Sequence, residues 1–160
     1  MIPSVIDYLL QLPEAMHFAK VHELCSDGIS SYRMLSDYGS GTFQLIEFEN
    51  NLLLILIGDY KPKDTFEKIT EISEDYMEIS QFETDSSSFK IGGRKRNQVD
   101  KGIYCYLNTQ KKTYTYCEGG KVVRFTKVIL SPQYFQTYFK LHDENNARLQ
   151  FCKGLSSQKS

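Results

Sequence analysis

The chain has 160 residues, of which 41% are hydrophobic and 24% are charged, and its formal net charge is −1. This composition is typical of one globular domain and argues against a disordered polypeptide. The balance of 19 basic and 20 acidic residues gives no global positive field, which disfavours a protein that binds nucleic acid through its overall charge. The abundance of tyrosine and phenylalanine favours strands.

Targeting signals are weak. Residues 1–16 lack a basic segment and Asp7 interrupts their apolar run, so we expect no signal peptide. The most apolar segment, 52–57, is too short to cross a bilayer, and we expect a cytoplasmic protein with no membrane partner. The four cysteines show no C-x-x-C spacing, which predicts free buried thiols: Cys25, Cys105, Cys117 and Cys152.

The first expected element is a helix over residues 4–16. Ser4 is a suitable N-cap, and apolar residues follow it at helical spacing. The turn Asp27-Gly28 then precedes a predicted strand over 29–35.

Strand signals dominate from residue 42 onward. The alternating segment 42–49 and the apolar segment 52–60 are joined by Asn50-Asn51, which predicts an antiparallel hairpin. The polar segment 61–75 is expected to form a loop or one short surface turn.

The second half of the chain continues with strands. Residues 76–84 and 88–93 are predicted strands, and 94–102 is a predicted basic loop. Residues 102–108 and 112–117 form the clearest predicted hairpin.

A long alternating strand over 121–130 ends this series, and the period then changes. Ser131 is an N-cap candidate and Pro132 occupies the first helical position, so a helix is expected from about residue 131. About eight or nine short strands and a terminal helix predict a mainly β fold, an antiparallel barrel or sandwich with a helical appendix.

Motifs for catalysis are missing from the sequence. There is no G-x-S-x-G elbow, no glycine-rich phosphate loop and no H-E-x-x-H pair. Carboxylates on predicted strands, such as Glu47 and Glu78, could form an acid/base pair, but solvent-facing side chains are the simpler interpretation. We therefore expect no catalytic residue, no metal ligand and no cofactor, and that the chain is not an enzyme.

The tyrosines suggest a ligand site instead. Tyr104 and Tyr106 share one face of a strand, and Tyr114 and Tyr116 share one face of the next. An odd-numbered hairpin loop would place all four on one face, whereas a slip of one residue would turn the second pair away. Such a wall would suit a small-molecule pocket, and ordinary cross-strand packing is the alternative.

Two further residues complete the candidate ligand contacts. Arg124 interrupts an apolar strand and would meet a polar or anionic ligand if its face points inward, although an outward arginine is the alternative. Phe48 lies near the end of another predicted strand. The full set of predicted ligand contacts is Tyr104, Tyr106, Tyr114, Tyr116, Arg124 and Phe48.

The helix after residue 131 carries large apolar residues that are not confined to one stripe. Part of this surface could meet a second copy of the chain. We therefore predict a homodimer that uses Tyr134, Tyr138 and Phe139.

Several segments, in this order, resemble the N-terminal sensor half of AraC-type bacterial transcription regulators: LLLILIGDY, YMEISQFETDSS, GGRKRNQVDKGIYCYLN and GKVVRFTKVILSPQYFQTYF. The resemblance covers roughly residues 40–143. Its most telling parts are the YMEISQFE strand, the segment Gly102–Asn108, and a last strand that ends in Val128-Ile129-Leu130 before the aromatic helix.

The resemblance implies a cupin-like antiparallel barrel with a short N-terminal helix and one or two C-terminal helices. It implies an effector-sensing and dimerisation domain over 1–144, whose ligand is a small molecule such as a sugar or an aromatic or organic acid. The family binds DNA through a C-terminal module, which we expect outside this chain, after a linker or further helix at 145–160. A small cupin-like enzyme and a stand-alone carbohydrate- or ligand-binding module are the alternatives.

Overall fold

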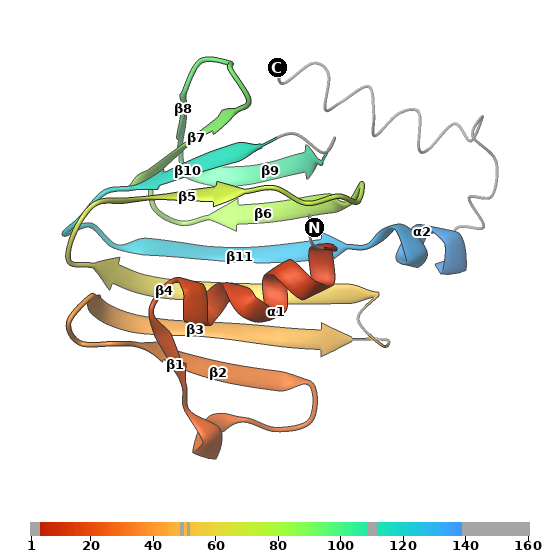
Figure 1. Ribbon diagram of the computed structural model, residues 1–160, viewed down its shortest axis with the longest axis horizontal. Helices are drawn as coiled ribbons and strands as arrows, with labels where there is room; N and C mark the ends of the chain where they lie inside the picture. Colours follow the sequence, from red (N-terminus) through yellow and green to blue (C-terminus); the bar gives the residue numbers. More distant parts are fainter. Residues whose placement is uncertain (1–3, 49, 51, 109–111, 139–160) are drawn as a thin grey trace.

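Two antiparallel β-sheets make up most of the structure (Figure 1), a computed structural model that describes residues 4–48, 50, 52–108 and 112–138. In chain order the elements are α1 (Val5–Ala15), β1 (Phe18–Lys20), the 3-10 helix η1 (His22–Leu24), β2 (Ile29–Met34), β3 (Gly39–Phe48), β4 (Leu53–Pro62), β5 (Phe66–Thr70), β6 (Met77–Phe82), β7 (Ser87–Ile91), β8 (Asn97–Val99), β9 (Gly102–Leu107), β10 (Thr113–Cys117), β11 (Val123–Leu130) and α2 (Pro132–Tyr138).

The larger sheet has the strand order β1-β2-β3-β4-β11-β6-β9, and the smaller sheet has the order β5-β10-β7-β8. Neighbouring strands run antiparallel throughout. The predicted fold class is confirmed: a mainly β, antiparallel sandwich with a short N-terminal helix and a C-terminal helix. No helix among the described residues is long and apolar enough to cross a membrane.

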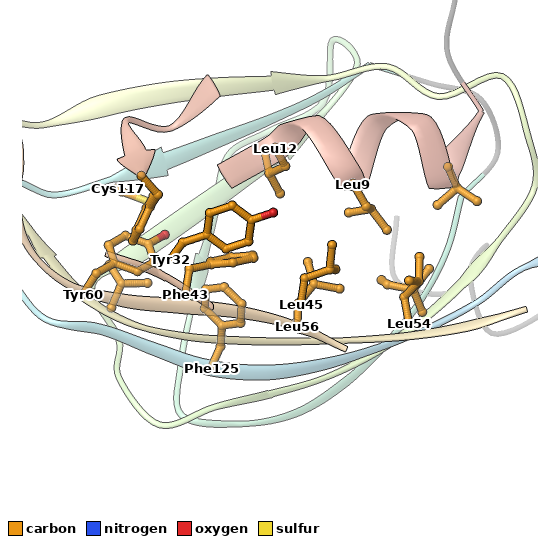
Figure 2. Close-up of a cluster of buried hydrophobic side chains, with 14 of the residues drawn as sticks. Leu9, Leu12, Tyr32, Phe43, Leu45, Leu54, Leu56, Tyr60, Cys117 and Phe125 are labelled. Atoms are coloured by element: carbon orange, nitrogen blue, oxygen red, sulfur yellow. The ribbon is translucent and has the colours of Figure 1, made fainter. Parts of the chain in front are cut away.

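Helix α1 begins where the sequence predicts. The Ser4 hydroxyl accepts a hydrogen bond from the Asp7 backbone N–H at 3.3 Å, which satisfies one of the free donors of the first turn. The helix lies over β3 and β4 (Figure 1). In Figure 2 its residues Leu9 and Leu12 point toward the inner face of this part of the larger sheet.

The core beneath α1 is built from large apolar side chains. Phe43, Leu45 and Leu54 are each 1% exposed. They come from inward positions of the predicted hairpin over 42–60, whose two strands pair over the whole length of β3 and β4. This hairpin is confirmed, and it forms the centre of the buried cluster in Figure 2.

Gly58 leaves room for aromatic packing in the middle of β4. It lies between Phe43 and Phe125 in the register of the three neighbouring strands. A Cβ at this position would lie 2.6 Å from atoms of the Phe125 ring. The two phenyl rings instead pack edge to face, with centroids 6.3 Å apart.

Helix α2 also begins as predicted. The Ser131 hydroxyl accepts a hydrogen bond from the Tyr134 N–H at 3.4 Å and donates one to the Leu52 carbonyl at 2.9 Å. The cap therefore ties the start of α2 to the beginning of β4. The predicted linker at 145–160 lies outside the described residues.

The predicted hairpin of 102–108 and 112–117 is wrong. Strand β9 pairs with β6 at one edge of the larger sheet, whereas β10 lies between β5 and β7 in the smaller sheet. Both segments are strands, but the chain passes from one sheet to the other between them. Alternation of side chains identifies a strand without identifying its partner, which is why the sequence misplaced this pair.

Three other strands were not predicted. Strand β5 lies within 61–75, where a loop was expected, because Phe66, Lys68 and Thr70 alternate with exposed residues. Strand β8 lies within the predicted basic loop 94–102, and β1 directly follows α1. Strands β1 and β8 are only 3 residues long and give little sequence signal.

A pair of phenylalanines on β3 tests this packing. Phe43→Ala is expected to lower the free energy of unfolding by about 3–5 kcal/mol, because it removes a fully buried ring. Phe48→Ala, on the same strand but 45% exposed, should change it by less than about 0.5 kcal/mol. Urea unfolding followed by circular dichroism measures both. Equal losses would contradict the assigned faces of β3.

Candidate functional site

A cavity of about 520 Å³ lies between the two sheets, and α1 forms part of its wall. Side chains from β4, β6, β9 and β11 of the larger sheet line one side, and side chains from β5, β7 and β10 of the smaller sheet line the other. The volume is within the range of pockets that bind small organic molecules in proteins. The cavity is therefore the candidate functional site.

The register of the larger sheet explains which of its residues face the cavity. Successive side chains of a strand point to opposite faces, so every second residue is turned inward. Lys127 of β11 lies opposite Ser80 of β6, and Ser80 lies opposite Tyr104 of β9. In the next inward row Glu78 lies opposite Tyr106. All five residues line the cavity.

The smaller sheet contributes its inward residues in the same way. Thr115 of β10 lies between Lys68 of β5 and Phe89 of β7. Two residues along β10, Cys117 lies opposite Phe66. These five side chains also line the cavity, so each sheet places one lysine on its inner face.

Lys127 is held by an ion pair within the larger sheet. Its Nζ lies 3.1 Å from the Glu78 carboxylate, and the two side chains are only 20% and 17% exposed. The ammonium also lies 5.3 Å from the centroid of the Phe82 ring and 4.9 Å from that of Phe125. Ion pairing and cation–π contacts together compensate the charge of Lys127.

Lys68 has a different environment. Within the described part of the chain, its side chain makes no hydrogen bond and lies within 4.0 Å of no carboxylate oxygen. Burial lowers the pKa of Lys68 below its ordinary value, and the nearby Cys117 and Glu78 counteract this only in part. Among the described residues, the Lys68 ammonium thus has no direct ion-pair partner in the cavity.

Phenol and thiol groups surround the two lysines. Burial raises the pKa of Tyr60, Tyr76 and Tyr106, because the phenolate would lose its hydration. Burial likewise raises the pKa of the Cys117 thiol, which is hydrogen-bonded to Tyr60. Figure 2 shows Cys117 and Tyr60 at the same end of the buried cluster. These groups are uncharged at neutral pH.

The structure divides the four predicted ligand tyrosines into two pairs. Tyr104 and Tyr106 line the cavity. Tyr114 and Tyr116 lie on the outer face of the smaller sheet, because Thr113, Thr115 and Cys117 occupy the inward positions of β10. The prediction that all four share one wall is wrong.

Basic side chains cover the two outward tyrosines. The Lys90 ammonium lies 4.7 Å from the Tyr114 ring centroid, and the Arg96 guanidinium lies 5.3 Å from that of Tyr116. These pairs are contacts on the outer surface of the smaller sheet and take no part in the cavity.

Arg124 and Phe48 are also outside the cavity. Arg124 is exposed, and its Nε lies 3.3 Å from a carboxylate oxygen of Asp59 and 3.9 Å from one of Glu83. Phe48 ends β3 and is 45% exposed. The outward arginine, which was the alternative reading, is the one observed.

The predicted dimer residues lie at the end of the described chain. Tyr138 is 48% exposed, and its ring centroid lies 4.8 Å from that of Tyr134, one turn earlier on α2. Phe139 lies outside the described residues. Their part in a dimer stays a prediction.

Sequence reasoning missed both cavity lysines. In β11 the bulky apolar residues Val123, Phe125 and Ile129 alternate with other residues, and Lys127 continues their series of every second position. Side chains at these positions point to the same, inner face. Lys68 alternates with Phe66 and Thr70 in the same manner, but the three-residue spacing of other apolar residues in 61–75 obscured the strand.

The donor groups of the cavity do not suit a resident metal ion. Among the described residues no three histidine, cysteine, aspartate or glutamate side chains lie close enough to bind one together. Cys25, Cys105 and Cys117 form no disulfide, and of these only Cys117 is buried, which corrects the expectation that all are. Cys152 lies outside the described residues.

Comparison with known proteins bears on the fold. No family model and no curated protein matches the sequence. The Cnp3 cupin domain of Schizosaccharomyces pombe is similar in structure at 10% identity, with a TM-score of 0.47, over 66% of this chain and 74% of that chain. A predicted oxalate decarboxylase from Thermotoga maritima is similar at 16% identity, with a TM-score of 0.43, over 67% and 96%.

A third similar structure is that of FeII HppE, at 11% identity, with a TM-score of 0.47, over 72% of this chain and 65% of that chain. At identities of 10–16%, the likeness to these structures concerns the fold alone. It does not show membership of the AraC-type regulators.

The expectation that the chain is not an enzyme is corrected by the same comparison. Structures with a similar fold include enzymes, among them the predicted oxalate decarboxylase. The expectation relied on missing sequence motifs, but a β-sandwich assembles reactive groups from strands that are distant in sequence. Lys68, Glu78 and Cys117 line one cavity although no motif connects them.

The uncompensated charge of Lys68 predicts a stabilising substitution. At pH 7 Lys68→Met should raise the free energy of unfolding by roughly 1 kcal/mol, a small gain because the residue is only half-buried. Lys61→Met, at an exposed position of β4, serves as the control and should have no effect.

The increase in the free energy of unfolding caused by Lys68→Met should depend on pH. Because the pKa of Lys68 is lower in the folded protein than in the unfolded chain, its charge costs stability below the folded pKa. That cost disappears as the pH rises through the folded pKa toward the ordinary value of 10.5. The difference in the free energy of unfolding between Lys68→Met and the wild type should therefore become smaller at alkaline pH, as measured by chemical denaturation. A difference that stays constant with pH would contradict the lowered pKa of Lys68.

Proposed function

We propose that this chain is the effector-sensing and dimerising domain of an AraC-type transcription regulator and that its cavity binds the small-molecule effector. The observation that carries the proposal is the volume of about 520 Å³ between the sheets. Protein interiors are normally packed without voids of this size, so a hollow sandwich indicates space kept for a ligand. Aromatic walls with a few polar groups suit a sugar or an aromatic or organic acid.

The position of α2 supports a coupling role. Strand β11 lines the cavity with Lys127 and Ile129, and α2 begins at Pro132, directly after this strand. A ligand that contacts the end of β11 can favour one orientation of α2 over another. Because the Ser131 cap fixes the start of the helix to Leu52, such a change would move α2 as a unit.

The same helix would carry the dimer contact. In this proposal Tyr134, Tyr138 and Phe139 meet a second copy, and DNA is bound through a separate C-terminal module. Ligand binding then changes the relative placement of the two DNA-binding modules by shifting the equilibrium between two arrangements of the dimer.

A thermal-shift screen against sugars, aromatic acids and siderophore-like compounds tests ligand binding. We expect at least one class to raise the melting temperature of the wild-type chain. Thr115→Phe, which places a ring inside the cavity, should abolish this shift. Thr126→Phe is the matched control on the outer face of β11 and should preserve it. If no compound class changed the melting temperature of the wild type, the result would contradict an effector-binding cavity.

Sedimentation velocity tests the dimer. The wild-type chain should be dimeric at micromolar concentration, and Tyr138→Asp should weaken association at least about tenfold, because it puts a charge into an apolar interface. Ile103→Asp, at a residue of β9 that is 74% exposed, is the control. If Ile103→Asp dissociated the dimer and Tyr138→Asp did not, the interface would lie at the edge strand β9 instead of α2.

A further inference from the structure

The positive and negative charges of the side chains that line the cavity do not cancel at its centre. Glu78 and Lys127 neutralise each other at 3.1 Å. Asp75 and Arg94 also belong to the lining, but both are exposed, and their charges are opposite. Among the described lining residues, Lys68 is left as the excess charge, so the cavity is suited to an anion.

Among the described residues, none that faces Lys68 forms an ion pair with it. The neighbouring strands of the smaller sheet present Thr115 and Phe89 in its row, which carry no charge. The titratable groups that share the cavity with Lys68 are Tyr8, Tyr60, Tyr76, Asp75, Glu78, Arg94, Tyr104, Cys105, Tyr106, Cys117 and Lys127. None of them has a hydrogen bond to Lys68 among the described contacts.

The hydroxyl groups of three cavity tyrosines are already engaged with protein atoms. The Tyr8 hydroxyl is hydrogen-bonded to Thr70 at 2.8 Å. The Tyr106 hydroxyl donates to Asn108 at 3.3 Å, and the Tyr104 hydroxyl donates to the Asp100 carbonyl at 2.9 Å. These three hydroxyls therefore form part of the protein's own hydrogen-bond network.

The rings themselves remain as apolar surface. Phe66 and Phe89 of the smaller sheet face Phe82, Tyr104 and Phe125 of the larger sheet across the cavity. Aromatic side chains pack favourably against another aromatic ring in edge-to-face and offset arrangements. The walls thus favour a flat apolar ligand, and Lys68 favours a negative charge on it.

We infer that the ligand of this cavity is an aromatic monocarboxylate whose carboxylate pairs with the Lys68 ammonium while its ring lies between the aromatic walls. The inference rests on the proposed function, in that the cavity binds a small molecule, and it adds the chemical class of that molecule. Pairing with an anion would compensate the Lys68 charge, for which the described residues provide no ion pair.

Two probes of equal shape and different charge test the inference. Isothermal titration calorimetry of the whole chain with 2-naphthoate and with 2-naphthamide compares an aromatic carboxylate with its neutral amide. We expect the wild type to bind the carboxylate at least about tenfold more tightly, the ratio that a charge-assisted hydrogen bond of about 1.4 kcal/mol gives.

Variants assign the preference to one residue. Lys68→Met should bind the two probes with similar affinity, whereas Lys61→Met should keep the wild-type preference. Circular dichroism checks that each variant is folded. The preference of the wild type for 2-naphthoate over 2-naphthamide should also decline at alkaline pH, because Lys68 loses its proton while the naphthoate stays ionised.

The outcomes separate this inference from the proposed function. Equal binding of both probes by the wild type, or an unchanged preference in Lys68→Met, would overturn the inference and leave a ligand-binding cavity intact. Binding of sugars with no binding of either probe would do the same. If the probes, sugars and all other screened compounds failed to bind, the proposed function would fall together with the inference.

Discussion

The alternation of side chains along the strands is the constraint on which the rest of this structure depends. Because every second residue of β11 and of β5 must face the opposite sheet, Lys127 and Lys68 share the interior with aromatic rings. The fold compensates the first lysine with Glu78, whereas the second forms no ion pair with any described residue. An apolar residue at position 68 would avoid the cost of this charge, which is why Lys68 is the residue on which the ligand inference rests.

The same constraint connects the cavity to the surface. Strand β11 contacts the cavity through its inward residues, forms ion pairs through Arg124 on its outer face, and continues into α2 after Ser131. Helix α1 contributes Leu9 and Leu12 to both the core and the cavity wall. A ligand therefore meets α1 and the strand that leads into α2, and this arrangement suits a domain in which ligand binding changes the orientation of α2.

Local features of the fold could be predicted from the sequence, and features that depend on distant pairing could not. The N-caps Ser4 and Ser131 and the hairpin over 42–60 are determined by neighbouring residues. The position of Tyr114 depends on which sheet receives β10, and nothing in the segment itself specifies that sheet. Arg124 was predicted as a ligand contact because it interrupts an apolar strand. The basic residue of β11 that faces inward is Lys127, three residues later.

The central claim is that the sandwich keeps a protonated lysine inside a ligand-binding hollow. Nuclear magnetic resonance of the lysine ¹³Cε groups tests it most directly, with Lys68 assigned from the spectrum of Lys68→Met. The account predicts that Lys68 titrates at lower pH than the other lysines and that its resonance moves when an aromatic carboxylate is added. Titration together with the surface lysines, and a resonance that the ligand leaves in place, would contradict it.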